Sequence, residues 1–328
     1  MNNSEQTKPI QWGIMGLGHI ATKFANDLLY VNDTELCAVA SRTQSKADEF
    51  AETYKAKKAY DSYEALVKDP DVDAVYIATP HALHQENTLL CLNHGKAVLC
   101  EKPFAMNAEE VETMITTAQN KNVLLMEALW TYFLPHYQFA LKEIQNPRYG
   151  KLLKLEANFG FFRAFDDASR LFRKNLGGGS LLDIGIYPIF AALSTLGKPN
   201  HIDAQATFFD NGADSSCKMI FKYASGAEAF LESSLIEDLP TEATFTFENG
   251  LLKINRQFHT PSSVSITYNR KTETKTFEED TFGYFHEINH FNALLRKGKT
   301  ESDLMTFEFS RNLISLLDQV RNLIQLEY

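Results

Sequence analysis

The chain has 328 residues, of which 44% are hydrophobic, and this length predicts two domains with substantial cores. Its 32 basic and 42 acidic residues give a formal net charge of −10, which argues against a nucleic-acid partner. Cys37, Cys91, Cys100 and Cys217 form no C-x-x-C pair and no disulfide spacing, as is typical of a cytoplasmic protein. The first nine residues lack the apolar core of an export signal, and no apolar run approaches the roughly 20 residues of a membrane span.

Strand and helix signals alternate through about residues 8–130. Short apolar runs that predict strands are separated by segments with apolar residues at helical spacing. The predicted strands are residues 10–16, 36–41, 73–78, 96–101 and 122–130, and the predicted helices are 19–31, 45–54, 82–94 and 108–120. Strands that alternate with helices indicate right-handed βαβ units, so we assign residues 1–130 to an α/β domain with a Rossmann-type parallel sheet.

Residues 131–328 have a different pattern, in which short strand-like runs follow one another with turn sequences such as DNG, SG and ENG between them. The predicted strands are residues 151–162, 202–209, 217–224, 228–235, 242–248, 251–258 and 263–269. Helices are predicted at 135–145, 283–297 and 302–326. Hairpin-type turns indicate an antiparallel sheet, so we expect an α+β domain with an open-faced sheet that binds substrate and mediates oligomerisation.

A G-x-G-x-x-A fingerprint follows the first predicted strand and opens the first predicted helix, with Gly16, Gly18, His19, Ile20 and Ala21. Glycines allow the backbone to approach a pyrophosphate, and the helix N-terminus supplies N–H groups and a positive dipole end. This context inside the first βαβ unit predicts a dinucleotide site.

The end of the second predicted strand bears on which dinucleotide binds. An NAD site usually has an acid there for the ribose 2′-hydroxyl, but this chain has Ser41, Arg42 and Thr43. An arginine forms charge-assisted contacts with a 2′-phosphate, and hydroxyl groups add further donors. We therefore expect NADP rather than NAD, the alternative being that Arg42 only faces solvent.

The stretch GGGSLLDIGIYPIF, residues 177–190, places one acid and one phenol four residues apart in an apolar segment. On a helix, Asp183 and Tyr187 would share a face. Locally, Ser180 and Asp183 fit a capping box, and Tyr187 fits a core aromatic. The same two side chains also fit a substrate-binding acid and a proton donor.

The fourth predicted strand ends in IATPHALH (77–84) and the fifth in EKPFAMN (101–107), at the edge where α/β sheets bind ligands. With GLGHIA and EKP in this order, the chain resembles the glucose–fructose oxidoreductase / inositol dehydrogenase (Gfo/Idh/MocA) family over nearly its whole length. In that family the Lys of E-K-P lies beside the nicotinamide and the substrate, which implies this role for Lys102. The cofactor contacts expected at this edge are Thr79, Pro80, His84, Glu101 and Lys102, although a plain loop or helix role is equally open for His84.

Many family members have D-x-x-x-H at the start of the second domain, where this chain has Asp183 followed by Tyr187. This departure, together with VASRTQSKADEFA, MEALWTYFLPHY and GGGSLLDIGIYPI, resembles the trans-dihydrodiol dehydrogenase / NADP-dependent D-xylose dehydrogenase branch. The resemblance implies hydride transfer between NADP and a cyclic polyol, dihydrodiol or aldose, with Lys102 and Tyr187 as a catalytic pair. We expect Asp183 to hold a substrate hydroxyl, a role that is compatible with capping its helix. A dinucleotide-sensing regulator without activity and a nicotinamide-dependent glycosidase are the alternatives.

Aromatic and basic side chains of the second half either form a substrate wall or belong to the core and the solvated surface. They are Trp130, Tyr132, Phe133, Phe159, Phe161, Phe162, Phe165, Arg163, Arg170 and Arg173. HEINH, residues 286–290, matches the H-E-x-x-H zinc motif, with Glu308 downstream as a conceivable third ligand. Because a Rossmann domain is the wrong context for a zinc protease, we expect no metal site.

The runs CKMIFKY and ATFTF suggest that the second-domain sheet has apolar residues on both faces. Helices can cover one face, and a second copy of the chain is the simplest cover for the other. The sequence therefore predicts a homodimer or a higher homo-oligomer.

Overall fold

The computed structural model describes residues 8–328, and residues 1–7, which carry most of the segment judged to lack an export signal, lie outside this range. The chain divides into two compact units that interleave in sequence. Among the described residues, the first contains 8–104, 110–130 and 281–307, and the second contains 105–109, 131–280 and 308–328. Residues 281–307 thus return to the first unit, and the division into domains at residue 130 stays a prediction.

The first unit is built on a six-stranded sheet in the order β3-β2-β1-β4-β5-β6, with every pair parallel. The strands are β1 Ile10–Met15, β2 Thr34–Ala40, β3 Lys58–Tyr60, β4 Ala74–Ile77, β5 Ala97–Glu101 and β6 Leu125–Ala128. β1, β4 and β5 are buried along their whole length, as expected of a parallel sheet covered on both faces. The strand order reverses between β1 and β4, and open α/β sheets bind ligands at the carboxyl ends of the strands at such a point.

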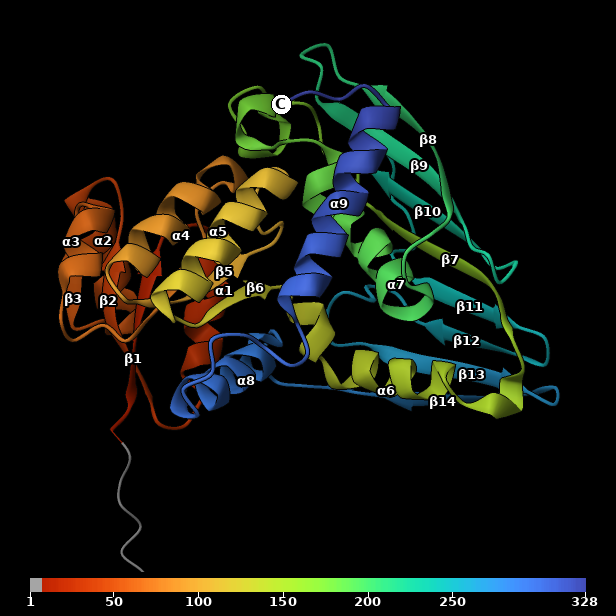
Figure 1. Cartoon of the computed structure of the whole chain (residues 1–328), viewed down its shortest axis with the longest axis horizontal. Coiled ribbons are helices and arrows are strands. Elements are labelled where there is room, and N and C mark those ends of the chain that lie inside the picture. Colours follow the sequence, from red (N-terminus) through yellow and green to blue (C-terminus); the bar gives the residue numbers. More distant parts are fainter. Residues whose placement is uncertain (1–7) are drawn as a thin grey trace, which may run out of the picture. The chain divides into compact units, whose positions relative to one another are not determined.

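Helices connect these strands in Figure 1, where α2 to α5 follow one another along the chain. Their bounds are α1 His19–Leu28, α2 Gln44–Tyr54, α3 Tyr63–Lys68, η1 His81–Leu83, α4 His84–Asn93 and α5 Ala108–Lys121. α8, Tyr284–Arg296, packs against α1. Asp27 of α1 accepts hydrogen bonds from the backbone N–H groups of Phe282 (3.0 Å) and Tyr284 (2.8 Å), so it caps α8 from another helix.

The second unit is built on an eight-stranded sheet in the order β14-β13-β12-β11-β7-β10-β9-β8. Only β7 and β10 pair in parallel, and the sheet is otherwise antiparallel, so the predicted fold class is confirmed in both units. The strands are β7 Leu152–Gly160, β8 His201–Phe208, β9 Asp214–Lys222, β10 Glu228–Ser234, β11 Ala243–Phe247, β12 Gly250–Ile254, β13 Ser263–Tyr268 and β14 Lys271–Thr276.

Helices lie on one face of this sheet, with α7 against β7 and β10 and α6 against β12 and β13 (Figure 1). The helical segments are η2 Trp130–Phe133, α6 Pro135–Ile144, η3 Pro147–Tyr149, η4 Arg170–Phe172, η5 Lys174–Leu176, η6 Leu181–Gly185, α7 Ile186–Leu196 and α9 Phe307–Leu323. The stretch Lys174–Leu196 is long and apolar enough to cross a membrane, but 89% of its apolar window is buried, so it is a core helix.

The other face of this sheet is largely polar, so the expectation of apolar residues on both faces holds only for a small area. In β9, Cys217, Met219 and Phe221 are buried, whereas Lys218 and Lys222 are exposed. β11 alternates in the same way, with its alanine and phenylalanines buried and its threonines half-buried. Because successive strand residues point to opposite faces, both runs place most of their large apolar side chains on the helix-covered side, and half-buried Ile220 lies on the other face, paired with Phe230 of β10. The uncovered face thus presents only a small apolar area, which includes Ile220 and the exposed Phe230, and the homo-oligomer stays a prediction.

Candidate active site

The glycine fingerprint lies at the carboxyl end of β1, in the turn that leads into α1. Gly16 has φ +83°, and a Cβ there would lie 2.8 Å from the carbonyl oxygen of Ala78, so only glycine fits. Gly18 precedes α1 as its N-cap residue, and no atom lies within 4 Å of the position of a Cβ. The first turn of α1 contains no acid, and His19 is exposed and Ile20 half-buried. This geometry fits a pyrophosphate on the free N–H groups of the helix.

The ends of β1 and β2 are joined directly, because the N–H of Gly16 donates to the carbonyl oxygen of Ala40 (3.2 Å). Ser41 is buried, and its N–H donates to the carbonyl oxygen of Tyr60 (3.1 Å), whereas Arg42 is exposed. The turn at Gly16 and the Ser41-Arg42 pair therefore lie side by side at one edge of the sheet. Residues 39–43, at the end of β2, contain no acid, so Arg42 has no carboxylate beside it in the sequence.

His84 is the first residue of α4 and is fully buried. Its Nδ1 lies 2.8 Å from the carbonyl oxygen of Pro103, and its Nε2 lies 2.9 Å from that of Thr79. The Thr79 hydroxyl accepts a hydrogen bond from the Asn87 side chain (3.1 Å). His84 thus links the loop after β4, which contains Thr79 and Pro80, to the E-K-P segment.

Glu101 ends β5 and is buried, and its carboxylate accepts hydrogen bonds from the Tyr76 hydroxyl and from the N–H of Lys102. Lys102 is half-buried and is joined to Pro103 by a cis peptide bond. Glu127 of β6 holds the next residue through the N–H of Phe104 (3.0 Å). The segment after β5 is therefore fixed from β4, β6 and α4, at the same edge of the sheet as the glycine turn.

The segment that carries Asp183 and Tyr187 begins with a π-turn, η6, and continues as α7. The capping box expected from Ser180 and Asp183 is wrong. Ser180 donates its hydroxyl to Asp214 of β9 (2.7 Å), and Asp183 accepts from the Arg170 guanidinium (3.1 Å). Both partners come from distant segments, and π-turns of this kind are frequent at functional sites.

Gly177, Gly178 and Gly179 precede η6 and pack closely against the segment that contains Arg170 and Leu171. Gly177 and Gly179 have φ of +74° and +123°. A Cβ on Gly178 would lie 2.7 Å from the carbonyl oxygen of Arg170. The N–H of Gly179 donates to the carbonyl oxygen of Leu171 (2.9 Å), so the glycines allow the loop to pack closely enough for Arg170 to reach Asp183.

Tyr187 is 4% exposed and belongs to a cluster of three rings. Its ring centroid lies 5.4 Å from that of Phe159 and 5.1 Å from that of His259, and the Phe159 and His259 rings lie 4.2 Å apart. His259 is not among the predicted site residues, because it lies between β12 and β13 outside any motif. Its short distance to Tyr187 arises only from folding, and the sequence held no signal for it.

The remaining aromatic candidates are divided between the interior and the surface. Trp130 is buried and stacks on Tyr284 (4.5 Å), and Phe133 is also buried. Phe162 is 62% exposed, and Phe165 packs on Phe172 and Phe209 (5.2 and 5.1 Å) while staying 42% exposed. Arg163 and Arg173 are exposed.

The H-E-x-x-H segment lies on α8, where Glu287 is fully buried and His290 contacts the Ser302 hydroxyl (2.8 Å). Among residues 8–328, no three His, Cys, Asp or Glu side chains are arranged to hold a metal ion. Burial raises the pKa of the Glu287 carboxyl well above its usual value, and the charges of Glu101 and Asp27 raise it further. Glu287 is thus an interior acid rather than an exposed general base.

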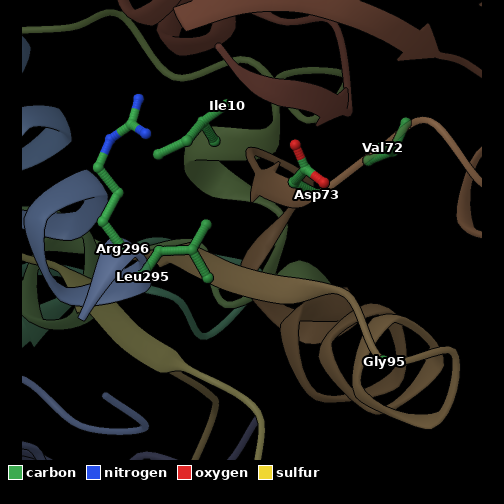
Figure 2. A pocket seen from close by; sticks show the side chains of 6 residues that line it. All are labelled: Ile10, Val72, Asp73, Gly95, Leu295 and Arg296. Atoms are coloured by element: carbon green, nitrogen blue, oxygen red, sulfur yellow. The ribbon is translucent and has the colours of Figure 1, made fainter. Parts of the chain in front are cut away.

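A small pocket in the first unit lies at the opposite edge of the sheet from the glycine turn. Figure 2 shows Ile10 at the start of β1, Asp73 before β4 and Arg296 at the end of α8 around it. Because parallel strands share their direction, this is the amino edge. The Asp73 carboxylate already accepts from the N–H of Gln11 (2.9 Å), and the Arg296 guanidinium donates to the carbonyl oxygen of Asp33 (3.2 Å). The pocket is therefore separate from the predicted dinucleotide site.

Two family models match the chain. Residues 10–129 match the Gfo/Idh/MocA oxidoreductase family with an NAD-binding Rossmann fold, and residues 137–253 match the Gfo/Idh/MocA C-terminal domain. The chain belongs to the Gfo/Idh/MocA oxidoreductase family. The predicted resemblance is thus confirmed, and with it the prediction of an oxidoreductase.

Two curated proteins are similar to this chain over nearly its whole length. Trans-1,2-dihydrobenzene-1,2-diol dehydrogenase of Xenopus tropicalis is 33% identical, over 97% of this chain and 99% of its own length. The scyllo-inositol 2-dehydrogenase (NADP(+)) IolU of Bacillus subtilis (strain 168) is also 33% identical, over 97% of this chain and 98% of its own length.

Solved structures share the fold. A 3-ketoreductase from Actinomadura kijaniata in complex with NADP and TDP-benzene superposes with a TM-score of 0.87 at 27% identity, covering 96% of this chain and 98% of its own. An aldose-aldose oxidoreductase from Caulobacter crescentus reaches a TM-score of 0.89 at 21% identity, covering 97% and 98%, which shows the fold alone.

Proposed function

We propose that this protein is an NADP-dependent dehydrogenase that interconverts the carbinol and the carbonyl of a cyclic polyol, dihydrodiol or aldose. The observation that carries the proposal is the carboxyl edge of the first sheet, where the Gly16 turn, the Ser41-Arg42 pair and Lys102 gather. The names of the relatives support it, since they act on a dihydrobenzene diol and on an inositol and one solved neighbour binds NADP.

The cofactor is held by the residues of that edge. The N–H groups at the start of α1 bind the pyrophosphate, with Gly16 and Gly18 allowing its approach and His19 and Ile20 at the first turn. Ser41 and Arg42 bind the 2′-phosphate, so NADP is preferred over NAD. Thr79, Pro80, His84, Glu101 and Lys102 border the nicotinamide end. NADP supplies or accepts the hydride.

Tyr187 is the acid/base and Lys102 its electrostatic partner. A free tyrosine has a pKa of about 10, and a neighbouring ammonium favours the phenolate, which makes a tyrosine usable as a base near neutral pH. In the oxidation the Tyr187 oxygen takes the hydroxyl proton, and in the reduction it returns that proton to the carbonyl oxygen. Asp183, oriented by Arg170 at 3.1 Å, accepts a hydrogen bond from a second substrate hydroxyl.

The ring cluster around Tyr187 supports a cyclic substrate. Phe159 and His259 both lie within ring-contact distance of Tyr187, and both are half-buried, so part of each side chain is accessible to a ligand. Aromatic rings of this kind bind the apolar face of a sugar or of a dihydrodiol. His259 is therefore proposed as an additional substrate contact.

The test is a screen of aldoses, inositols and dihydrodiols followed by NADPH absorbance, repeated with Tyr187→Phe. Removing the hydroxyl should reduce kcat by roughly 10²–10⁴, the usual contribution of a positioned proton donor, with NADPH affinity unchanged. Tyr223→Phe is the matched control, because Tyr223 is a buried tyrosine of the second unit whose hydroxyl has no hydrogen-bond partner within residues 8–328. Normal turnover in Tyr187→Phe would refute the acid/base role, and release of sugar without net absorbance change would indicate a glycosidase.

Two further parts of the proposal concern the cell and the assembly. We place the protein in the cytoplasm, because all four cysteines are buried free thiols. We also propose a homodimer through the uncovered sheet face, where Ile220 of β9 pairs with Phe230 of β10, which is 38% exposed. Light scattering at micromolar concentration that gives the 37.2 kDa mass of one chain would exclude the dimer.

A further inference from the structure

Asp214 is a buried carboxylate at the start of β9, in the second unit, and neither the sequence motifs nor the proposed mechanism uses it. Its side chain is completely buried, and Oδ1 has no hydrogen-bond partner in the part of the chain that the structure describes. A buried carboxylate without full pairing costs stability, so a role other than packing is expected of it.

Oδ2 of Asp214 holds the first turn of the segment that carries Asp183 and Tyr187. It accepts hydrogen bonds from the N–H of Leu181 (2.7 Å), which opens η6, and from the Ser180 hydroxyl (2.7 Å). A carboxylate in this position acts as the N-cap that Ser180 itself does not supply.

Close contacts fix the same turn on both sides. A Cβ on Gly179 would lie 2.1 Å from Oδ1 of Asp214, and one on Gly185 would lie 3.0 Å from Oγ of Ser233. The Ser180 and Ser233 hydroxyls are themselves 3.0 Å apart. The π-turn is therefore joined to β9 and β10 at its first and last residues, two residues before Tyr187.

Burial raises the pKa of Asp214 to about 6, although the hydrogen bonds from Ser180 and Leu181 oppose this change. The titratable groups that interact with it are the Cys217 thiol and the Tyr328 phenol, and burial raises the pKa of both. Asp183 and Arg321 also act on Tyr328. Of Asp214, Cys217 and Tyr328, Asp214 is therefore the group that changes charge between pH 5 and pH 7.

We propose that Asp214 is a positioning residue for the reaction: its ionised carboxylate, through Leu181 and Ser180, fixes the π-turn that presents Asp183 and Tyr187 to the substrate. This rests on the proposed function, in which Tyr187 moves the proton. A protonated carboxyl accepts hydrogen bonds less strongly than a carboxylate, so the turn loosens when Asp214 gains a proton. Activity then falls below about pH 6 for a reason remote from the reacting atoms.

The first experiment compares the pH profile of kcat in the wild type and in Asp214→Asn, which keeps the shape and one acceptor oxygen but does not titrate. The variant should lose about tenfold in kcat at pH 7.5, as a charge-assisted contact becomes a neutral one. Its decline of kcat between pH 7 and pH 5 should be smaller than in the wild type, while KM and the NADPH Kd stay within about twofold. Asp203→Asn, an exposed aspartate of β8 in the same sheet, is the control and should keep the wild-type profile.

The second experiment measures backbone hydrogen exchange in residues 179–187 of Asp214→Ala, which removes both acceptor oxygens. Exchange there should accelerate about tenfold or more, and exchange in β1 to β6 should not change. If this variant does not fold, Ser180→Ala removes one of the two donors and should produce a smaller acceleration in the same residues. Wild-type exchange in 179–187, or faster exchange with an unchanged kcat profile, overturns the proposal and leaves the proposed function standing. Normal turnover in Tyr187→Phe overturns both.

Discussion

Replacing the buried acid of the H-E-x-x-H segment tests how α8 is held in the first unit. Glu287 is completely buried, and neither carboxylate oxygen has a hydrogen-bond donor among residues 8–328. Burial is the largest cause that raises its pKa, and the charges of Glu101 and Asp27 add to the effect. The folded chain therefore keeps Glu287 protonated at a pH where the unfolded chain has released the proton. Glu287→Gln preserves the shape and removes the titration.

The sign and the magnitude follow from proton linkage. Above the ordinary glutamate pKa the folded state binds one more proton than the unfolded state, so stability is full at low pH and falls as pH rises. The slope is about 1.4 kcal/mol per pH unit while the folded chain retains the proton. Between pH 5.5 and pH 7.5 the wild type should therefore lose stability relative to Glu287→Gln, by up to about 1.4 kcal/mol for each pH unit over which the folded chain keeps the proton.

Urea denaturation, monitored by tryptophan fluorescence, measures this difference in unfolding free energy for the first structural unit, which contains Glu287. Both tryptophans, Trp12 and Trp130, belong to the first unit, and Trp130 stacks on Tyr284, three residues before Glu287. Glu52→Gln, at an exposed position of α2, is the control and should follow the wild type at every pH. The difference in unfolding free energy between the wild type and Glu287→Gln should change steadily from pH 5.5 to pH 7.5, with the wild type losing stability relative to the variant. A constant difference between wild type and Glu287→Gln across this range would show that Glu287 is ionised in the folded chain and would refute the reasoning.

Three further predictions concern the first unit. Arg42→Ala should weaken NADPH binding by about 1.5–3 kcal/mol and leave NADH binding unchanged, and equal affinities of the wild type for both cofactors in calorimetry would contradict it. Asp27→Ala should lower the unfolding free energy by about 2 kcal/mol or more, since the N–H groups of Phe282 and Tyr284 lose their acceptor; a variant with the wild-type urea midpoint would contradict it. Gly16→Ala should lower the free energy of unfolding by about 2 kcal/mol or more and weaken NADPH binding, because Gly16 has φ +83° and a backbone oxygen would lie 2.8 Å from the new Cβ. An unchanged urea midpoint together with an unchanged NADPH Kd would contradict this prediction.

The sequence alone determined the two sheets and the turn at the cofactor edge. Apolar runs separated by helical spacing predicted the parallel strands β1, β2, β4, β5 and β6, because burial on both faces is written into each run separately. Hairpin turns predicted the antiparallel sheet for the same local reason. No such pattern marked the short elements β3 and α3 or the charged edge strand β14. These elements form through contacts with neighbouring strands and helices.

Only the tertiary structure decided which groups meet around Tyr187 and α8. Ser180 and Asp183 carry a capping-box spacing, yet Asp214 and Arg170 outcompete it with charged partners from distant segments. The His259 ring contacts Tyr187 from a loop that carries no motif. Glu287 is an interior acid because α8, capped by Asp27, packs within the first unit, to which residues 281–307 belong. Spacing along the chain specifies local hydrogen bonds and strand faces, whereas a contact between residues far apart in sequence depends on the free energy of the whole packed unit.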